Sequence, residues 1–286
     1  MKLNKNANTN ILIVGLGLLG GSYAKALKKK GYYISAITLD QDSIDYALSE
    51  GIIDEGAAMV DPRLIQEAEL VVFALYPHIF IEWIKEYQHL FCAGTVLTDV
   101  TGVKSSVVYE IQEILRQDVE FIAAHPMAGR EVYGVRNSSD KIFEGANYIV
   151  VPTERNTEGA IALCEELGRE LGFASISRLS PEKHDEMIAY LSQLTHCIAV
   201  SLMCCNNGEN LEAYTGDSFR DLTRIARINE KMWSELFMMN KEQLLAQMDA
   251  FSKTFEEMRV ALQNGDVEKM QDMMRLSTER RGRFDK

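Results

Sequence analysis

Long hydrophobic runs are missing from this sequence of 286 residues. No stretch approaches the ~18 continuous apolar residues that cross a bilayer as a helix. The segment Met1–Asn10 is polar, and the apolar run that follows it is short and interrupted by glycine, unlike a secretory signal. We therefore expect a cytoplasmic protein with no membrane partner.

Basic residues are also in short supply. The chain has 30 lysines and arginines against 42 aspartates and glutamates, for a formal net charge of −12. Because binding to nucleic acid requires a basic face toward the phosphates, we expect no nucleic-acid partner. The five cysteines are an odd number, form no C-x-x-C pair and lie in apolar segments. This pattern predicts free thiols in a reducing compartment, and we find no convincing metal site.

What is present is the composition of an ordinary globular protein, 47% hydrophobic and 25% charged, with enough length for two domains. Over residues 1–179, short apolar runs typical of buried strands alternate with helical patterns. Such alternation predicts βαβ units and a parallel sheet, with ligands at the C-terminal ends of the strands. The expected strands are 11–14, 33–39, 70–75, 95–100, 121–124, 148–151 and 174–178, and the expected helices are 18–31, 42–48, 79–90, 105–115 and 157–171.

The periodicity changes at Pro181, after which only helical patterns remain. Ser180-Pro181-Glu182 is a typical helix start, and this helix is expected to reach about Cys205. Apolar residues from Trp233 to Leu262 recur at steps of three and four, and such a stripe requires a partner surface. The stripe is either a core helix of one subunit or a dimer interface. The predicted fold class is therefore α/β then all-α, with the helical domain at 180–286.

The first expected strand runs directly into Gly15-Leu16-Gly17-Leu18-Leu19-Gly20, which fits G-x-G-x-x-G ahead of a helix. In a dinucleotide site, Gly15 allows the tight turn, Gly17 lets the backbone approach the pyrophosphate, and Gly20 lets helix and strand pack closely. The phosphates then rest on free N–H groups at the helix start, where Leu18 and Leu19 lie. A purely structural glycine turn is the alternative.

An acidic residue follows at the expected distance. The second apolar run ends in Asp40, about 20 residues past the glycines, where a carboxylate binds the ribose hydroxyls of NAD. Because this carboxylate would repel the ribose phosphate of NADP, NAD is the expected cofactor.

A histidine follows the expected strand at 121–124. This places His125 at the C-terminal edge of the sheet, on the cofactor side, and Pro126 favours an extended backbone that helps to end the strand. A histidine there can accept a hydroxyl proton while hydride leaves the same carbon. A structural histidine is the alternative.

Three arginines lie within eight residues in the segment Phe219–Arg227, in an otherwise acidic protein. Guanidinium groups match carboxylates in bidentate geometry, so the segment is a candidate carboxylate-binding patch. An exposed helix face, with the arginines paired to Asp221 and Glu230, is the alternative. On the preceding helix, Gln193 and His196 are three residues apart and so share a face.

Taken together, these motifs resemble the prephenate dehydrogenases, with the arogenate and cyclohexadienyl dehydrogenases as close relatives. The resemblance covers nearly the whole chain. It implies an NAD-binding Rossmann domain followed by a helical dimerisation domain, and oxidative decarboxylation of a cyclohexadienol to 4-hydroxyphenylpyruvate on the route to tyrosine. The motifs that carry it are Gly15–Gly20 with Asp40, Asp99–Lys104, His125–Gly129 with Glu131, Ser180–Glu182 with His184-Asp185, and Phe219–Arg224 with Trp233.

The resemblance also implies roles for individual residues. His125 would hold the substrate's ring hydroxyl and draw off its proton as hydride moves to NAD. Arg224 would bind a substrate carboxylate, His196 would be a second substrate-contacting histidine, and Glu131 would lie near the pocket entrance. Further expected substrate-binding residues are Gln193, Asp217 and Trp233, and further expected cofactor-binding residues are Tyr76, Pro77 and Thr101.

The sequence departs from the family pattern at two positions. Gly102 stands where the family often has a serine that hydrogen-bonds the substrate hydroxyl or the catalytic histidine, which leaves that role to Thr101, Ser105 or water. Asp217 stands where a glycine-rich loop is usual, so binding of the substrate side chain, or of tyrosine as an inhibitor, can differ. Prephenate and arogenate share the ring hydroxyl and carboxylate, and the sequence does not choose between them.

Three other functions share part of the pattern. A β-hydroxyacid dehydrogenase has the same architecture, but the second half holds no lysine-based G-x-x-G-x-G-x-x-x-K helix. A short-chain dehydrogenase requires Tyr-x-x-x-Lys, which none of the 11 tyrosines supplies. A non-catalytic dinucleotide sensor would keep the glycines but would not require His125, His196 and Arg224 together, so turnover distinguishes it.

Overall fold

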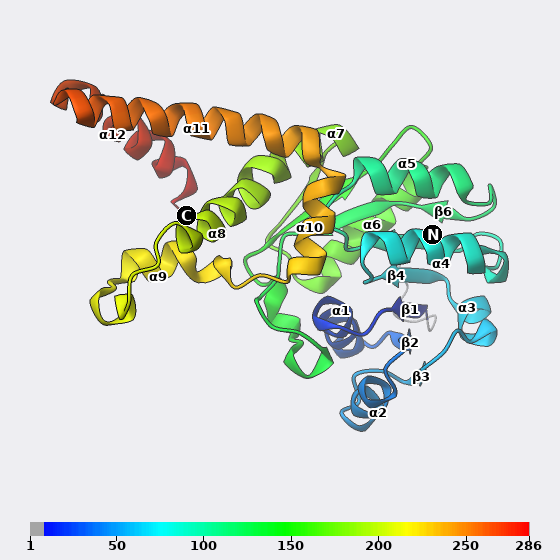
Figure 1. The fold of residues 1–286 in the computed structure, drawn as a ribbon. Coiled ribbons are helices and arrows are strands. Elements are labelled where there is room, and N and C mark those ends of the chain that lie inside the picture. The colour runs from blue at the N-terminus through cyan, green and yellow to red at the C-terminus, as the bar shows by residue number, and fades with distance from the viewer. Residues whose placement is uncertain (1–8, 286) are drawn as a thin grey trace.

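A parallel sheet forms the centre of the N-terminal part. The computed structural model describes residues 9–285, and in this range six strands pair in the order β3-β2-β1-β4-β5-β6, which is the Rossmann order (Figure 1). Every pairing in this sheet is parallel, as expected. The strands are β1 (Asn10–Val14), β2 (Tyr33–Ile37), β3 (Glu55–Ala57), β4 (Leu70–Phe73), β5 (Val96–Asp99) and β6 (Glu120–Phe121).

Helices cover both faces of this sheet. Side chains alternate between the two faces of a strand, and both faces are buried, which is why β1 is apolar along its length. Ile11 and Ile13 pack in the core under α1, α2 and α6, whereas Leu12 and Val14 pack under α3, α4 and α5. These helices are α1 (Leu18–Lys29), α2 (Gln41–Ser49), α3 (Pro62–Glu67), α4 (Pro77–Tyr87), α5 (Ser105–Ile114) and α6 (Glu158–Leu171).

The prediction of a single strand at 121–124 is wrong. Phe121 pairs with Leu97 of the large sheet, whereas Ala123 pairs antiparallel with Val151 in a second sheet of three strands. Residues 121–124 are all buried, so they form one continuous apolar run. Nothing in that run indicates that Phe121 pairs with one sheet and Ala123 with the other. The second sheet consists of β7 (Ala123–Pro126), β8 (Asn147–Val151) and β9 (Ser175–Arg178), with β8 and β9 parallel.

His125 therefore lies within a strand, not after one, and that strand belongs to the second sheet. The sequence patterns predict neither β3 nor α3. Strand β3 is a three-residue edge strand containing Gly56, too short for a hydrophobic pattern. Helix α3 does carry a start signal, because the Asp61 carboxylate accepts a hydrogen bond from the Arg63 N–H and Pro62 occupies the first turn.

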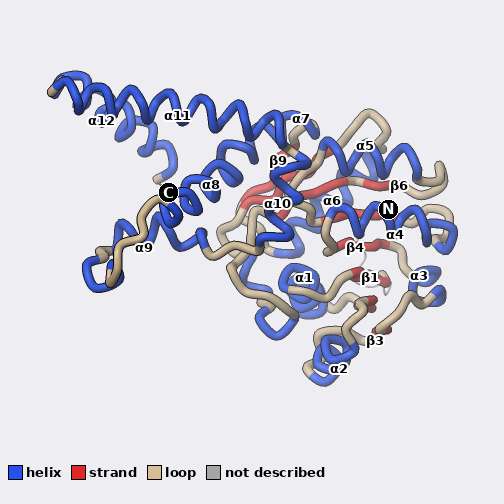
Figure 2. The backbone as a smooth tube through the Cα atoms, viewed as in Figure 1, coloured by secondary structure: helices blue, strands red, loops and turns tan. Residues whose placement is uncertain are grey.

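From Pro181 to residue 285 the described chain contains helices and loops, as expected. Helix α10 packs against the sheet domain through Leu236, α11 extends away from that domain, and α12 turns back beside α11 (Figure 2). The helices are α7 (Pro181–Ile188), a π-helical turn (Ala189–Gln193), α8 (Leu194–Cys204), α9 (Asp217–Thr223), α10 (Glu230–Met239), α11 (Lys241–Asn264) and α12 (Val267–Arg281).

The apolar stripe from Trp233 to Leu262 is divided between α10 and α11, which meet at Asn240. Its first part is core, since Leu236 and Leu244 are buried. Its last part is not, since Phe255 is 64% exposed and Leu262 is 68% exposed in the single chain. The exposure of the distal part of α11 therefore favours the interpretation of the stripe as a dimer interface over its interpretation as a core helix.

One segment is long and apolar enough to cross a membrane. It is the continuous helical segment Pro181–Cys204, with a mean hydropathy of 1.5 over its best window, of which 28% is buried. The expectation concerned continuous apolar residues, and this segment passes only as an average, because charged residues such as Glu182 and Asp185 interrupt it. The core helix of a soluble protein passes the same test, and the buried charged residue Asp185 lies within the segment.

Candidate active site

The glycine turn between β1 and α1 has the geometry of a dinucleotide site. Gly15 has φ +96°, and a Cβ on it would lie 2.5 Å from the Ala74 carbonyl oxygen. A Cβ on Gly20 would lie 1.9 Å from the Gly15 carbonyl oxygen, so strand and helix are in direct backbone contact there. A Cβ on Gly17, by contrast, would have no other atom within 4 Å. The turn is thus closed where the protein packs and open where a pyrophosphate would lie beside the first N–H groups of α1.

Asp40 lies just beyond β2, at the position that precedes α2. The side chain is exposed, and its carboxylate accepts a hydrogen bond from the Ser43 hydroxyl at 2.5 Å. Its place at the C-terminal end of the strand beside β1 is where the ribose hydroxyls are expected.

His125 is joined to the helical part by a chain of short contacts. Its Nδ1 lies 2.8 Å from Nε2 of His184, and Nδ1 of His184 lies 2.8 Å from Oδ1 of Asp185, both on α7. The Asp185 carboxylate also accepts hydrogen bonds from the backbone N–H groups of Lys104 and Ser105, each at 2.8 Å. These two N–H groups lie at the start of α5. The imidazole of His125 is thus held from the helical domain, not only from its own strand.

Burial shifts the pKa values of His125, His184 and Asp185. Removal from water lowers the pKa of His125 well below its ordinary value, with smaller contributions from His184 and Lys104. Burial also lowers the pKa of His184, against the opposing hydrogen bond with Asp185. For Asp185, burial alone would raise the pKa, but the hydrogen bonds with His184 and the Ser105 N–H outweigh it and keep the pKa below its ordinary value. Both histidines are therefore neutral at pH 7, and the carboxyl group is ionised.

A fully buried ion pair lies beneath His125. The Lys104 ammonium is 2.7 Å from Oδ2 of Asp99, and neither side chain is exposed. Oδ1 of Asp99 accepts a hydrogen bond from the Ala124 N–H, directly before His125. The Thr101 hydroxyl contacts the Asp99 carboxylate and the Val103 carbonyl, and accepts from Lys104 Nζ at 3.2 Å. These contacts explain the Asp99–Lys104 motif as the support of the strand end.

Arg224 and Glu131 meet across the two parts of the chain. Arg224 Nη1 donates to Glu131 Oε1 at 2.5 Å, joining the segment after α9 to the loop after β7. His196 stacks on Trp233 with ring centroids 3.8 Å apart, and its Nδ1 lies 2.9 Å from the Ser192 carbonyl oxygen. Burial lowers the pKa of His196; the charge of Glu131 acts to raise this pKa and that of Arg224 to lower it. The structure thus brings together four of the expected substrate-binding residues.

The remaining expected residues lie elsewhere in the network. Gln193 is buried, and its amide donates to the Leu236 carbonyl and accepts from Asn240, which ties the π-helical turn to α10. Asp217 is exposed and pairs with Arg220 on its own helix at 2.7 Å. Tyr76 accepts a hydrogen bond from Asn229 at 3.1 Å, across the two parts of the chain. Pro77 opens α4, and Leu18 and Leu19 open α1.

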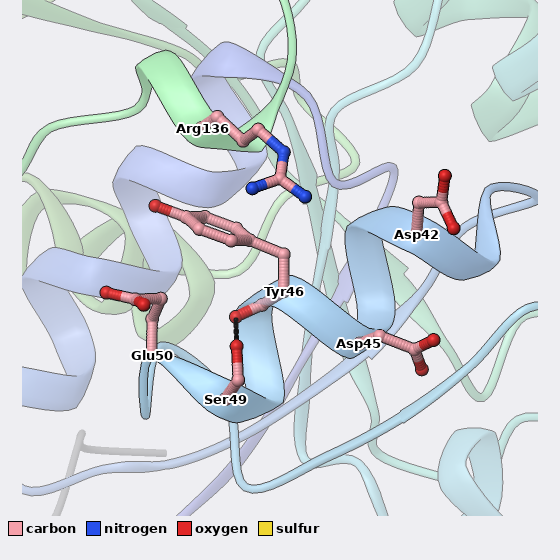
Figure 3. Close-up of a pocket in the computed structure, with 6 residues that line it drawn as sticks. All are labelled: Asp42, Asp45, Tyr46, Ser49, Glu50 and Arg136. Carbon is pink, nitrogen blue, oxygen red and sulfur yellow. Dashed lines mark hydrogen bonds between the residues drawn. The ribbon is translucent and has the colours of Figure 1, made fainter.

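Two surface hollows lie away from these residues. One is formed by α2 and the short helix at 135–137, where the Arg136 guanidinium lies 4.3 Å over the Tyr46 ring (Figure 3). The other follows α12 at Gln271, Met274, Arg275 and Thr278. Neither hollow is lined by a residue of the candidate site. Within residues 9–285, no group of three or more His, Cys, Asp or Glu side chains is placed to hold a metal ion.

Fold and site together place the chain among the two-domain dehydrogenases, in which a Rossmann domain is followed by a helical domain and both contribute to the site. Family models are more specific. The prephenate dehydrogenase nucleotide-binding domain matches residues 23–176, and the prephenate dehydrogenase dimerization domain matches residues 180–276. The chain therefore belongs to the prephenate dehydrogenase family.

Individual relatives agree. Prephenate dehydrogenase of Bacillus subtilis is 31% identical over 91% of this chain and 72% of its own length. Cyclohexadienyl dehydrogenase of Zymomonas mobilis is 28% identical over 90% of each chain. Among solved structures, prephenate dehydrogenase of Aquifex aeolicus, in complex with hydroxyphenyl propionate and NAD+, has a TM-score of 0.87 at 29% identity, covering 97% of this chain and 98% of that chain.

Proposed function

We propose that the protein catalyses the NAD-dependent oxidative decarboxylation of prephenate to 4-hydroxyphenylpyruvate, in tyrosine biosynthesis. The observation that carries this proposal is the setting of His125: neutral, partly buried and held through one ring nitrogen by His184. A neutral imidazole with its other nitrogen available is the group required to take a proton from a ring hydroxyl. The chain is an oxidoreductase of aromatic amino acid biosynthesis by family.

NAD is the cofactor. The glycine turn fits it, because Gly17 is open where the pyrophosphate lies, while Gly15 and Gly20 are closed against protein. When bound, NAD accepts the hydride from the substrate carbon. Gly15, Gly17, Leu18, Leu19 and Gly20 would bind the pyrophosphate, and Asp40, Tyr76 and Pro77 would border the remainder of the dinucleotide.

The remaining residues bind and orient the substrate. We assign the substrate carboxylate to Arg224, whose side chain is 64% exposed, so that its guanidinium can donate beyond its pair with Glu131. His196, stacked on Trp233, borders the same region. His125 draws off the hydroxyl proton as hydride leaves the ring. Loss of the carboxylate as carbon dioxide restores aromaticity and makes the step downhill.

We further propose domain limits of 1–179 and 180–286, and a homodimer formed through the helical domain. The exposed apolar residues of distal α11 and the partly covered helical segment Pro181–Cys204 both favour a partner subunit over solvent. In this view the segment is an interface helix of a cytoplasmic enzyme.

Substituting Asp40 by serine is expected to relax the preference for NAD. The Asp40 carboxylate repels the ribose phosphate of NADP, so Asp40→Ser should raise kcat/KM for NADP relative to NAD by roughly 10-fold or more. The measurement is initial rate against each cofactor. Asp42→Ser, in the first turn of α2, is the matched control and should leave the ratio unchanged. An unaltered ratio in Asp40→Ser would assign cofactor choice to another residue.

Substituting Arg224 by alanine is expected to raise KM for the ring substrate by roughly 10- to 100-fold, with a smaller change in kcat. This is the range for losing a charge-assisted hydrogen-bonded pair. Steady-state kinetics at saturating NAD measures it. Arg169→Ala, on the surface of α6, serves as control. A loss confined to kcat would contradict ground-state binding by Arg224.

The test of the proposed function is NADH production by the purified protein with NAD and prephenate, with arogenate and NADP in parallel and tyrosine added as inhibitor. Turnover of prephenate with release of carbon dioxide is the expected result. Turnover of arogenate alone would keep the chemistry and change the substrate. Binding of NAD without turnover of either ring compound would favour a dinucleotide sensor.

A further inference from the structure

We propose that His184, anchored by Asp185, fixes the tautomer of His125, so that Nε2 of His125 is the proton acceptor in the reaction. This inference rests on the proposed function only for its kinetic consequence. The assignment of the ring nitrogens follows from contacts in the chain itself.

The argument begins at Asp185, because its carboxylate can only accept hydrogen bonds. It receives N–H groups from Lys104 and Ser105, and its Oδ1 lies 2.8 Å from Nδ1 of His184. That nitrogen must therefore carry a proton. An unprotonated Nδ1 would set its lone pair against the carboxylate at this distance.

The second step concerns the other nitrogen of His184. Burial lowers the pKa of this histidine, so the neutral ring is favoured and carries a single proton, the one on Nδ1. Nε2 of His184 is then an acceptor. Because it lies 2.8 Å from Nδ1 of His125, His125 must donate from Nδ1. The lone pair of His125 is thus left on Nε2, on the opposite side of the ring.

The groups around the pair support this assignment. His184 is fully buried, so no water competes for its Nε2. Lys104, Asp99 and Asp185 are the charged groups that act on it, and the first two are paired to each other. During turnover the hydroxyl proton of the substrate moves to Nε2 of His125. The resulting imidazolium keeps its Nδ1 proton, which Nε2 of His184 continues to accept.

This inference also bears on the position of Gly102, where the family often has an orienting serine. Thr101 is not available for that role, because its hydroxyl is buried against Asp99, Val103 and Lys104. A neutral histidine from α7 does the orienting instead. His184 is a positioning residue: it acts on the substrate only through His125.

The direct test is ¹⁵N NMR of the histidine rings in the intact, substrate-free protein. The chain has five histidines, and the signals of His125 are those lost in His125→Asn. The inference predicts a protonated Nδ1 and an unprotonated Nε2 for His125. The reverse pattern would overturn it. This measurement requires neither turnover nor a folded His184 variant, so it stands even if the proposed function fails.

The kinetic test compares two substitutions of His184. His184→Phe keeps a ring but offers no acceptor, and should lower kcat by roughly 10²-fold with little change in KM, within the range for general-base catalysis. His184→Gln, which retains an acceptor and a donor, should recover most of that loss. Both should bind NAD with the affinity of the parent protein. A His184→Phe variant that binds NAD normally and keeps the parent kcat would also overturn the inference.

Discussion

Replacing His125 by asparagine is expected to lower kcat by roughly 10²- to 10⁴-fold while KM changes little. Asparagine keeps a side-chain N–H that can still face His184, but it has no basic nitrogen for the substrate hydroxyl. The effect should therefore fall on the chemical step and leave substrate and NAD binding intact. Steady-state kinetics with prephenate, together with NAD affinity by titration, measures both.

The matched control is His89→Asn. His89 is exposed on the short helix after α4, and within residues 9–285 it forms no hydrogen bond with a candidate site residue. It should keep the parent kcat. If His125→Asn also keeps it, His125 is a structural histidine and the proposed mechanism is wrong.

Replacing Lys104 by methionine is expected to destabilise the fold by about 3–5 kcal/mol. Methionine fills most of the space, but it leaves the Asp99 carboxylate buried without a counter-charge. Burial already lowers the pKa of Lys104, against the opposing effect of Asp99, which shows how closely desolvation and pairing compete here. Urea unfolding followed by circular dichroism measures the loss.

The control for this prediction is Lys85→Met. Lys85 and Glu110 form an ion pair with the same separation of 2.7 Å, yet their side chains are 52% and 42% exposed. An exposed ion pair contributes little to the free energy of unfolding, so the variant should have nearly the same free energy of unfolding as the parent protein. Equal losses in the two variants would mean that burial of the Lys104–Asp99 pair is not what determines its importance.

Local patterns predicted the Rossmann half of the fold because its signals are short-range. A buried apolar strand, a glycine turn and an acid at a fixed distance follow one another within Ile11–Asp40, and each has the place expected for it. The exchange of partners between β6 and β7 could not be predicted in the same way. Phe121 and Ala123 are both buried apolar residues, and only the strands that pair with them differ.

The candidate site shows the same limit at longer range. His125 could be singled out by its place after an apolar run, but nothing local indicates that His184, 59 residues later, holds its ring. Arg224 and Glu131 are 93 residues apart, and their pairing depends on how the helical part folds back onto the loop after β7. The His184-Asp185 pair was visible as a motif, and its role required the structure.

The π-helical turn at Ala189–Gln193 determines which way two histidines face. His184 and His196 are twelve positions apart, and at about 100° per residue a regular α-helix would set them about 120° apart around its axis. The π-helical turn rotates the chain by a smaller angle per residue than an α-helix does. The angle between the two histidines around the helix axis is therefore smaller than about 120°, and both imidazoles lie toward the same side. The turn thus acts as a phase correction for one extra residue: rewinding it to a regular α-helix with every residue kept would rotate His196 and everything after it away from its present neighbours, whereas deleting one residue of the turn would leave them nearly in phase.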